Sequence, residues 1–247
     1  MRLVSWNIRA GGGIRVDGIL AQLERWSPDI VGLCEFRATP PSRRLAAALY
    51  DLGYEYQLTT ANAALPGRNA LLIASRMPLR RHSLRAAPLE PGRWLLATVV
   101  GEHPFIMGLM HLPNMVTGRK LAFMESIASI ANGWRRGPAV FLGDTNCGWP
   151  LVDEETRVFG HETAAWLDGL HKRGWRDAYR HYWPDERIYT WYSPNGGNGF
   201  RLDQAFVNRP MLPRLQGVAY EWGRPDGIDA RRDALSDHAA LVVDFAD

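Results

Sequence analysis

The sequence predicts an α/β fold with sheets in the middle and helices outside, and three observations carry that prediction. Apolar runs of strand length recur along the chain, and most are continuous rather than alternating, as expected for strands covered on both faces. Amphipathic helical patterns lie between these runs. No Pro/Ser-rich linker separates two blocks, so residues 1–247 are expected to form a single domain.

The predicted strands share a short apolar core, and polar residues stand at many of their ends. If the last two strands run antiparallel to the others, these polar ends meet at one edge of the sheets. In chain order the strands cover 3–7, 29–35, 69–75, 94–100, 105–111, 138–144, 201–207 and 239–245.

Helices are predicted where apolar residues recur on one face, over 17–26, 42–52, 117–131 and 161–173. Ser42 is the expected N-cap of the second helix, and a glycine follows the end of each of the last three. The main irregular stretch is 182–201. Its GGNG run fits either a loop that contacts substrate or a long hairpin turn.

Composition excludes several classes of protein. A hydrophobic content of 46% with 22% charged residues argues against disorder, and no run approaches the roughly 18 apolar residues of a membrane span. A first strand at Leu3 leaves no room for a signal peptide. Cys34 and Cys147 fit no zinc spacing and are expected to be buried thiols rather than a disulfide. We therefore expect a cytoplasmic protein.

The net charge of +3 is compatible with a phosphate-bearing partner but does not demand one. Almost all the positive charge is arginine, with Lys120 and Lys172 as the two lysines. Planar guanidinium groups suit phosphate oxygens, although codon bias explains the same composition.

Polar side chains gather at the strand ends that are expected to meet. Taken singly, each has a structural explanation, such as an Asx turn, a rim carboxylate or a core histidine. Together they have no packing rationale, because buried charge is costly unless a metal or a partner compensates it. The residues are Asn7, Glu35, His111, Asp144, Asn146, Asp203, Asp237 and His238.

These residue types suit phosphate-ester hydrolysis on a hard cation such as Mg²⁺ or Mn²⁺. Such a cation prefers oxygen ligands, which Glu35 and Asn7 supply, with Asp237 as a possible further ligand. Asp144 is the candidate for activating the attacking water. The expected stabilisers of the phosphoryl oxygens are the imidazolium of His238 and the amide of Asn146.

Two further residues complete the predicted chemistry. Asp203 is the candidate carboxylate that keeps His238 charged and oriented, since aspartate–histidine pairing is a recurring device. His111 is expected either to stabilise the phosphate or to protonate the leaving oxygen.

The segments LVSWNIRAGGG, DIVGLCEFR, NALLIASRMPL, MHLPN, FLGDTN, YTW, RLDQAFV and SDHAALVVDF resemble the endonuclease/exonuclease/phosphatase superfamily. That superfamily includes deoxyribonuclease I, exonuclease III, sphingomyelinases and inositol polyphosphate 5-phosphatases. The resemblance runs in family order from residue 3 to residue 245. It implies an α/β fold of the deoxyribonuclease I type, a four-layer αββα sandwich of two stacked mixed β-sheets with the site at one end.

Carried over by position, the resemblance supports the roles given above. It makes Asn7 and Glu35 metal ligands and Asp237 a residue near the metal. It pairs Asp144 with Asn146 as the GDxN motif, and it places His238 on phosphate.

The chain also departs from the exonuclease III branch. Arg9 stands where that branch usually has an acidic or amide residue, and His111 stands where it has tyrosine. Pro113 and Asn114 keep its Pro–Asn, in which the asparagine touches phosphate. These departures weaken a specific claim of abasic-site cleavage but leave the hydrolytic chemistry intact.

The sequence thus predicts a divalent-metal-dependent phosphodiesterase, in the first place a nuclease acting on DNA or RNA. The alternative is an intracellular phosphatase or phosphodiesterase of small esters such as inositol phosphates, sugar phosphates or lipid head groups. A non-catalytic binding module is disfavoured because Glu35, Asp144 and His238 are all present. Candidate phosphate contacts outside the core site are Arg9, Arg15, Arg119 and Arg201, each equally compatible with a solvated surface arginine.

Overall fold

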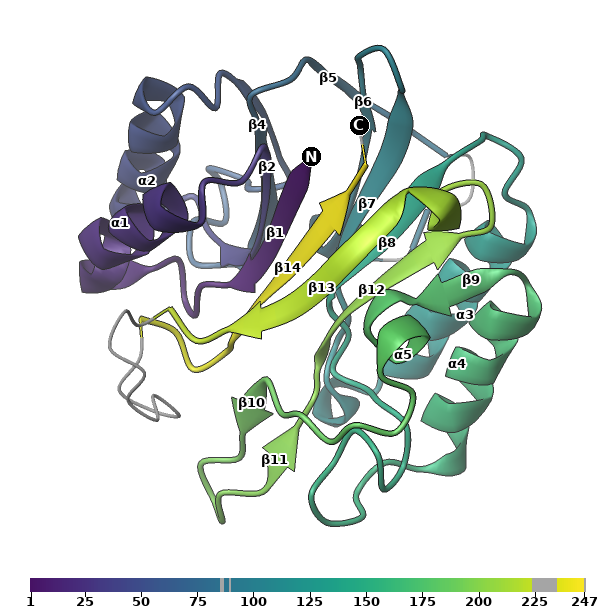
Figure 1. Cartoon of the computed structure of the whole chain (residues 1–247). Coiled ribbons are helices and arrows are strands. Elements are labelled where there is room, and N and C mark those ends of the chain that lie inside the picture. The colour runs from purple at the N-terminus through teal and green to yellow at the C-terminus, as the bar shows by residue number, and fades with distance from the viewer. Residues whose placement is uncertain (85–86, 89, 224–234, 247) are drawn as a thin grey trace.

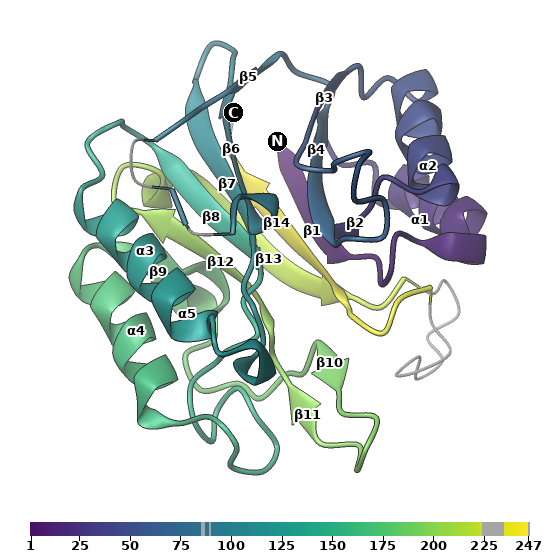
Figure 2. The ribbon, with the colours of Figure 1, turned by 180° about the vertical axis from the view of Figure 1, so that it is seen from behind.

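Two six-stranded mixed sheets lie face to face, and helices cover their outer faces, in the computed structural model (Figure 1 and, from behind, Figure 2). The structure describes residues 1–84, 87–88, 90–223 and 235–246. Helices and sheets therefore form four layers in the order αββα, which agrees with the architecture implied by the resemblance.

The first sheet has the strand order β13-β14-β1-β2-β4-β3. β1 runs parallel to β2 and antiparallel to β14, so the last strand of the chain lies beside the first. The bounds are β1 (Arg2–Asn7), β2 (Ile30–Phe36), β3 (Tyr56–Thr59), β4 (Ala70–Ser75), β13 (Leu215–Glu221) and β14 (Ala240–Phe245).

The second sheet has the order β5-β6-β7-β8-β12-β9 and repeats the same local pattern. β7 runs parallel to β8, and β12 runs antiparallel to β8 with Asp203 opposite Asp144. The bounds are β5 (Leu79–Arg81), β6 (Trp94–Val99), β7 (Phe105–His111), β8 (Ala139–Asp144), β9 (Trp175–Asp177) and β12 (Asp203–Asn208).

Helices α1 (Val16–Trp26) and α2 (Pro40–Asp51) pack on the first sheet, and α3 (Lys120–Asn132) and α4 (His161–Lys172) pack on the second. The short α5 (Ala178–Tyr182) follows β9. A short hairpin is formed by β10 (Trp191–Tyr192) and β11 (Gly199–Phe200). The remaining elements are the 3-10 turns η1 (Gly13–Arg15), η2 (Pro91–Arg93), η3 (Met115–Thr117) and η4 (Leu212–Arg214).

The hydrophobic core has three main layers, which explains the continuous apolar runs. In β1, Leu3 packs between the two sheets, whereas Val4 and Trp6 pack against the helices α1 and α2. The same alternation in the second sheet sends Leu142 of β8 inward and Phe141 outward. Burial on both faces removes the polar alternation of a half-exposed strand.

All eight predicted strands are present, and the last two run antiparallel to their neighbours β1 and β8, as predicted. The strands that the sequence did not predict are short, or, like β13, have few buried residues. The GGNG stretch closes the β10–β11 hairpin, which favours the hairpin reading of that segment. Both cysteines are buried and free, as predicted.

The first residues of two helices were predicted wrongly. α2 begins at Pro40 with Thr39 as its N-cap, because proline suits the first helical position. Ser42 instead lies buried inside the helix, and its hydroxyl donates to the carbonyl oxygen of Gly11. α3 begins only at Lys120, since the preceding η3 turn ends in the left-handed Gly118.

No helix in the described parts of the chain is long and apolar enough to cross a membrane.

We predict that Gly108→Ala in β7 lowers the free energy of unfolding by about 1–3 kcal/mol, because its Cβ would overpack a rigid region. That Cβ would lie 2.7 Å from Cδ1 of Phe141 and 2.8 Å from the ring of Trp94. Chemical denaturation measures the difference. Gly217→Ala in β13 is the control, since its Cβ meets nothing within 4 Å. Equal stability of both variants would contradict the prediction.

Candidate active site

Side chains from both sheets meet at one edge of the sandwich. The strand ends that carry them lie just above the β10–β11 hairpin in Figure 1. Asn7 ends β1, and His111 and Asp144 end the parallel strands β7 and β8. Asp203 opens β12, and His238 stands just before β14. Because β12 runs antiparallel to β8 and β14 runs antiparallel to β1, the first residues of β12 and β14 lie beside the last residues of β8 and β1.

Asp144 is the centre of this group and is almost fully buried. The amide nitrogen Nδ2 of Asn7 donates to its Oδ2 at 3.0 Å, so this hydrogen bond joins the two sheets. The Nε2 atoms of His111 and His238 lie 3.4 and 3.9 Å from the same oxygen. Burial raises the pKa of Asp144, although the two imidazoles act in the opposite direction. A carboxylate with a raised pKa is a stronger base for a water molecule.

His238 is held as an imidazolium. Its Nδ1 lies 2.9 Å from Oδ2 of Asp203, and its main-chain oxygen accepts a hydrogen bond from the indole of Trp6. Burial alone would lower the pKa of His238. The negative charges of Asp203 and Asp144 outweigh it and raise the pKa to about 10. His238 therefore carries a positive charge at neutral pH next to Asp144.

His111 has the opposite electrostatic character. Burial lowers its pKa to about 4, since the attraction of Asp144 does not outweigh desolvation and the nearby charge of Arg93. Among the described residues its Nδ1 has no hydrogen-bond partner. A neutral imidazole can hydrogen-bond a phosphate oxygen, but it has no extra proton to give to a leaving group. This favours the phosphate-stabilising role of the two roles predicted for His111.

Glu35 reaches the site through a break in β2. Its φ of +59° lies in the left-handed region, where the pairing with β4 shifts register between Cys34 and Phe36. A bulge of this kind re-aims one side chain without disturbing the rest of the strand. Oε2 of Glu35 accepts the N–H of Ala10 at 2.7 Å.

The oxygens of Glu35 and Asn7 are held by neighbouring peptide groups. Arg9 N–H donates to Oδ1 of Asn7 at 3.0 Å, and Ala10 N–H donates to the carboxylate of Glu35. In the described structure no hydrogen bond reaches Oε1 of Glu35. Two N–H groups of the short loop after β1 thus hold one carboxylate oxygen of Glu35 and the amide oxygen of Asn7. Oxygen ligands of these two kinds suit a hard cation such as Mg²⁺.

A second group of possible ligand atoms consists of Asp144, Asp203 and His238, whose atoms all lie within 4.8 Å of one another. We favour the Glu35 and Asn7 side for the metal, because Asp203 and His238 already satisfy each other by a hydrogen bond. An imidazolium also cannot be a metal ligand, since ligation needs the neutral ring.

Asp237 and Asn146 lie beside this group with defined partners. The indole Nε1 of Trp191 donates to Oδ2 of Asp237 at 3.3 Å, and the Arg9 guanidinium lies 4.0 Å from that oxygen. Asn146 has a left-handed φ of +49°, and its N–H donates to Oδ1 of Asp144. One amide N–H of Asn146 donates to the carbonyl of Leu112, and among the described residues the other has no acceptor, so it can reach a substrate oxygen.

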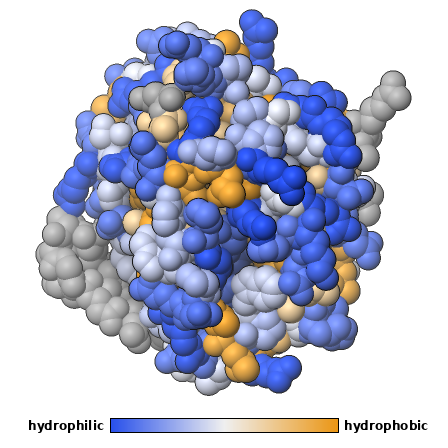
Figure 3. Space-filling model, turned by 45° about the vertical axis from the view of Figure 1, so that its right-hand side comes forward, coloured by the Kyte–Doolittle hydropathy of each residue, from blue (hydrophilic) through white to orange (hydrophobic). Residues whose placement is uncertain are grey.

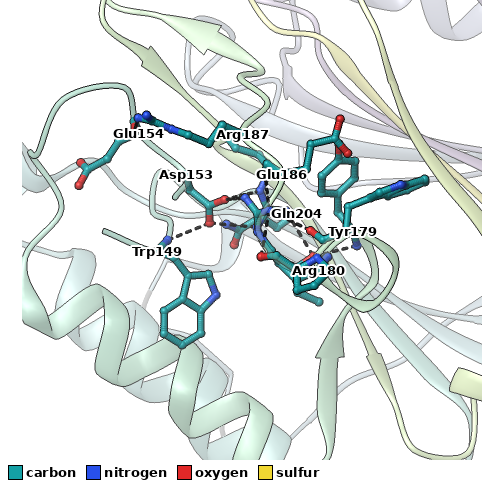
Figure 4. A network of polar contacts seen from close by, with 12 residues as sticks. Trp149, Asp153, Glu154, Tyr179, Arg180, Glu186, Arg187 and Gln204 are labelled. Atoms are coloured by element: carbon teal, nitrogen blue, oxygen red, sulfur yellow. Dashed lines mark hydrogen bonds and ion pairs between the residues drawn. The ribbon is translucent and has the colours of Figure 1, made fainter. Parts of the chain in front are cut away.

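The expectation that Arg201 binds substrate is wrong, because its side chain is fully buried and paired. Its guanidinium donates to both carboxylate oxygens of Asp153, at 2.7 and 3.0 Å, and to both of Asp177, at 2.6 and 3.3 Å. Arg180 also pairs with Asp153, and Figure 4 shows this network from close by. Of the other predicted contacts, Arg9 and Asn114 are exposed.

Lys120 is a site residue that sequence reasoning missed. It is 97% buried, and its ammonium donates to the main-chain oxygen of Asn146. Burial lowers its pKa. The signal was present, because Lys120 precedes Phe123, Met124 and Ile127 at helical spacing and so falls on the apolar stripe of α3.

A cavity of about 760 Å³ lies apart from these groups, between α4, β9 and α5. Trp149, Leu167, Trp175, Arg176 and Arg180 are among its lining residues, and no predicted catalytic residue is. Figure 3 brings this side of the molecule forward and shows a mainly hydrophilic surface with small hydrophobic patches. The candidate active site is therefore an open edge of the sandwich and not this cavity.

A profile of the endonuclease/exonuclease/phosphatase family matches residues 4–238. The chain belongs to this family. A relative from Dictyostelium discoideum, described as a DNA-(apurinic or apyrimidinic site) endonuclease, is 21% identical over 238 residues. That match covers 87% of this chain and 64% of the relative, so the chain spans less than two thirds of that protein.

Three solved structures have a similar fold over nearly the full length of this chain. An AP endonuclease from Archaeoglobus fulgidus has a TM-score of 0.79 with 21% identity, and each chain is covered to 99%. A 3′-5′ exonuclease from Neisseria meningitidis has a TM-score of 0.77 with 23% identity over 100% of both chains. A 3′ phosphatase from Neisseria bound to a product DNA hairpin has a TM-score of 0.74 with 22% identity over 99% of both chains. These similarities confirm the predicted fold.

We predict that Arg201→Met lowers the free energy of unfolding by about 3–5 kcal/mol at pH 7, because the buried carboxylate of Asp177 loses its guanidinium partner and that of Asp153 keeps only Arg180. Burial would raise the pKa of Asp153, but the charges of Arg201 and Arg180 outweigh it and lower the pKa. The stability from this carboxylate is present above its ordinary pKa and is lost as the pH falls through the folded value. The deficit should therefore shrink in acid.

Urea denaturation of this variant and the wild type between pH 3 and pH 7 measures the deficit, with the exposed Arg9→Met as the control. A variant as stable as wild type at pH 7 would show that Arg201 is not a buried structural charge.

Proposed function

We propose that the protein is a divalent-metal-dependent phosphodiesterase, in the first place a nuclease that hydrolyses DNA or RNA. The observation that carries the proposal is the meeting of Asp144, Asn7 and the Asp203–His238 pair at the edge of two sheets, in a chain of this family. A base, an imidazolium and oxygen ligands are the groups that hydrolysis of a phosphodiester requires.

The residues divide the chemistry between them. Glu35 and Asn7, with Asp237 as a further candidate, would hold Mg²⁺ or Mn²⁺, and the metal would neutralise phosphate charge. Asp144 orients the attacking water and takes its proton. His238, kept charged by Asp203, stabilises the phosphoryl oxygens, and neutral His111 and the free amide N–H of Asn146 add hydrogen bonds. Arg9 and Asn114, both exposed, are the proposed contacts to flanking phosphates.

Nucleic acid is favoured as the substrate because one relative is named as an endonuclease of DNA and one structural neighbour is bound to a product DNA hairpin. A phosphatase of terminal or small phosphate esters is the second candidate, since one of the structural neighbours is described as a 3′ phosphatase. We also propose a cytoplasmic location, in keeping with two buried, unpaired thiols.

A substrate panel tests the proposal. It contains single- and double-stranded DNA, abasic DNA, DNA with a 3′-phosphate, RNA and inositol phosphates, each with Mg²⁺, Mn²⁺ or EDTA. Metal-dependent cutting of a nucleic acid supports the nuclease proposal. Release of phosphate from a monoester alone would move the protein to the phosphatase class. Silence on every substrate would overturn the proposal.

We predict that Asp144→Asn lowers kcat by about 10²–10⁴-fold, because the amide cannot accept the proton of the water. Folding should change little, since the amide is of similar size and can still hydrogen-bond. Steady-state kinetics on the best substrate of the panel, with thermal denaturation as the check on folding, gives the result. Turnover equal to that of the wild type would remove Asp144 from the mechanism.

We predict that Glu35→Gln raises the Mg²⁺ concentration needed for half-maximal activity by about tenfold or more, since a neutral oxygen is a weaker ligand for a hard cation. Isothermal titration with Mn²⁺ measures the affinity without relying on turnover. Glu90→Gln, on a carboxylate that pairs with Arg93 and Arg119, is the matched control. An unchanged Mg²⁺ titration for Glu35→Gln would show that the ligand assignment is wrong.

A further inference from the structure

We propose that Arg201 and Tyr220 are positioning residues that hold the two sheets in the register at which Asp203 meets His238. The inference rests on the proposed function, in which that pair stabilises the phosphoryl oxygens. Neither residue reaches the site itself. Arg201 is fully buried, and Tyr220 acts on the main chain of Asp203.

The pair that needs positioning is formed across the sandwich. Asp203 opens β12 of the second sheet, whereas His238 stands at the entry to β14 of the first. Their side chains meet at 2.9 Å. Two packed sheets can slide relative to each other more easily than two paired strands, and displacement of a catalytic group by about 1 Å can cost on the order of 100-fold in rate.

Tyr220 links the two sheets close to this pair. It lies on β13, where it is opposite Leu241 of β14, three residues after His238. Its hydroxyl crosses to the second sheet and donates to the main-chain oxygen of Asp203 at 2.7 Å. The same hydroxyl accepts from Nη1 of Arg201 at 3.1 Å. One oxygen atom from the first sheet thus fixes the residue of the second sheet that holds His238.

Arg201 fixes that hydroxyl in turn, because its own guanidinium cannot move. Four carboxylate oxygens hold it, two from Asp153 in the loop after β8 and two from Asp177 at the end of β9. Its main-chain N–H also donates to the carbonyl of Asp153 at 2.8 Å. The guanidinium therefore joins the loop that follows β8 and the end of β9 to the segment just before β12.

A purely structural role would make the same contacts but would not act through Asp203 and His238. The two roles differ in kinetics. A positioning residue changes kcat with little change in KM, and its effect disappears when the pair is already broken.

The test is Tyr220→Phe, which removes only the hydroxyl. Tyr182→Phe is the matched control, because the Tyr182 hydroxyl donates to the carbonyl of Leu215, at the other end of β13. The probe is bis(p-nitrophenyl) phosphate with Mn²⁺. We expect Tyr220→Phe to lower kcat about tenfold with KM within twofold, and Tyr182→Phe to leave both unchanged. Wild-type kcat in folded Tyr220→Phe, or an equal loss in both variants, would overturn the inference.

A double-mutant cycle asks whether the effect passes through the pair. In an Asp203→Asn background, which keeps the main-chain oxygen but not the charge, Tyr220→Phe should lower kcat by less than twofold. A full tenfold loss in that background would show that Tyr220 acts elsewhere. Arg201→Lys should resemble Tyr220→Phe, since lysine keeps the charge but cannot bind both carboxylates and the hydroxyl.

A measurement without turnover separates this inference from the proposed function. The proton on Nδ1 of His238, hydrogen-bonded to Asp203, is expected as a resolved NMR signal in the wild type and in Tyr182→Phe. It should broaden or vanish in Tyr220→Phe. An unchanged signal would overturn the positioning role, whereas an inactive wild type with the expected signals would overturn only the proposed function.

Discussion

The candidate site exists only while the two sheets keep their relative position, because its hydrogen bonds run between them. Asn7 of the first sheet donates to Asp144 of the second, and His238 at the edge of the first meets Asp203 of the second. Each sheet alone carries an incomplete set of groups. The apolar layer between the sheets, in which Leu3 and Leu142 pack, is therefore part of the catalytic arrangement as well as of stability.

The buried edge gives two imidazoles opposite charge states beside one carboxylate. His238 has a second carboxylate, Asp203, and its pKa rises to about 10. His111 has only Asp144, and desolvation lowers its pKa to about 4. A single partner does not offset burial, whereas two partners do. The site thus contains a fixed positive charge and a neutral hydrogen-bonding ring, which suits binding and stabilisation of a phosphate group.

Residue type alone did not indicate which charged side chains are buried and which are exposed. Arg201 was expected to contact phosphate or to lie on the surface, yet it is buried and neutralised by Asp153 and Asp177, and Lys120 lies on the buried stripe of α3. The position of Lys120 at helical spacing from Phe123, Met124 and Ile127 was a local signal of its burial that sequence reasoning missed. No local signal predicted that of Arg201, because its two carboxylate partners come from segments 48 and 24 residues away.

The sequence by itself determined which strands end in polar residues, the family, and most helices and strands. It could do so because hydrophobic periodicity and short motifs are local properties. It also supplied the residues that meet at the edge. Tertiary structure alone decided which of them touch, which are charged and which arginine is buried. Those properties depend on desolvation and on distances between Asp144, Asp203 and His238, which lie far apart in the chain and are set by the packing of two sheets.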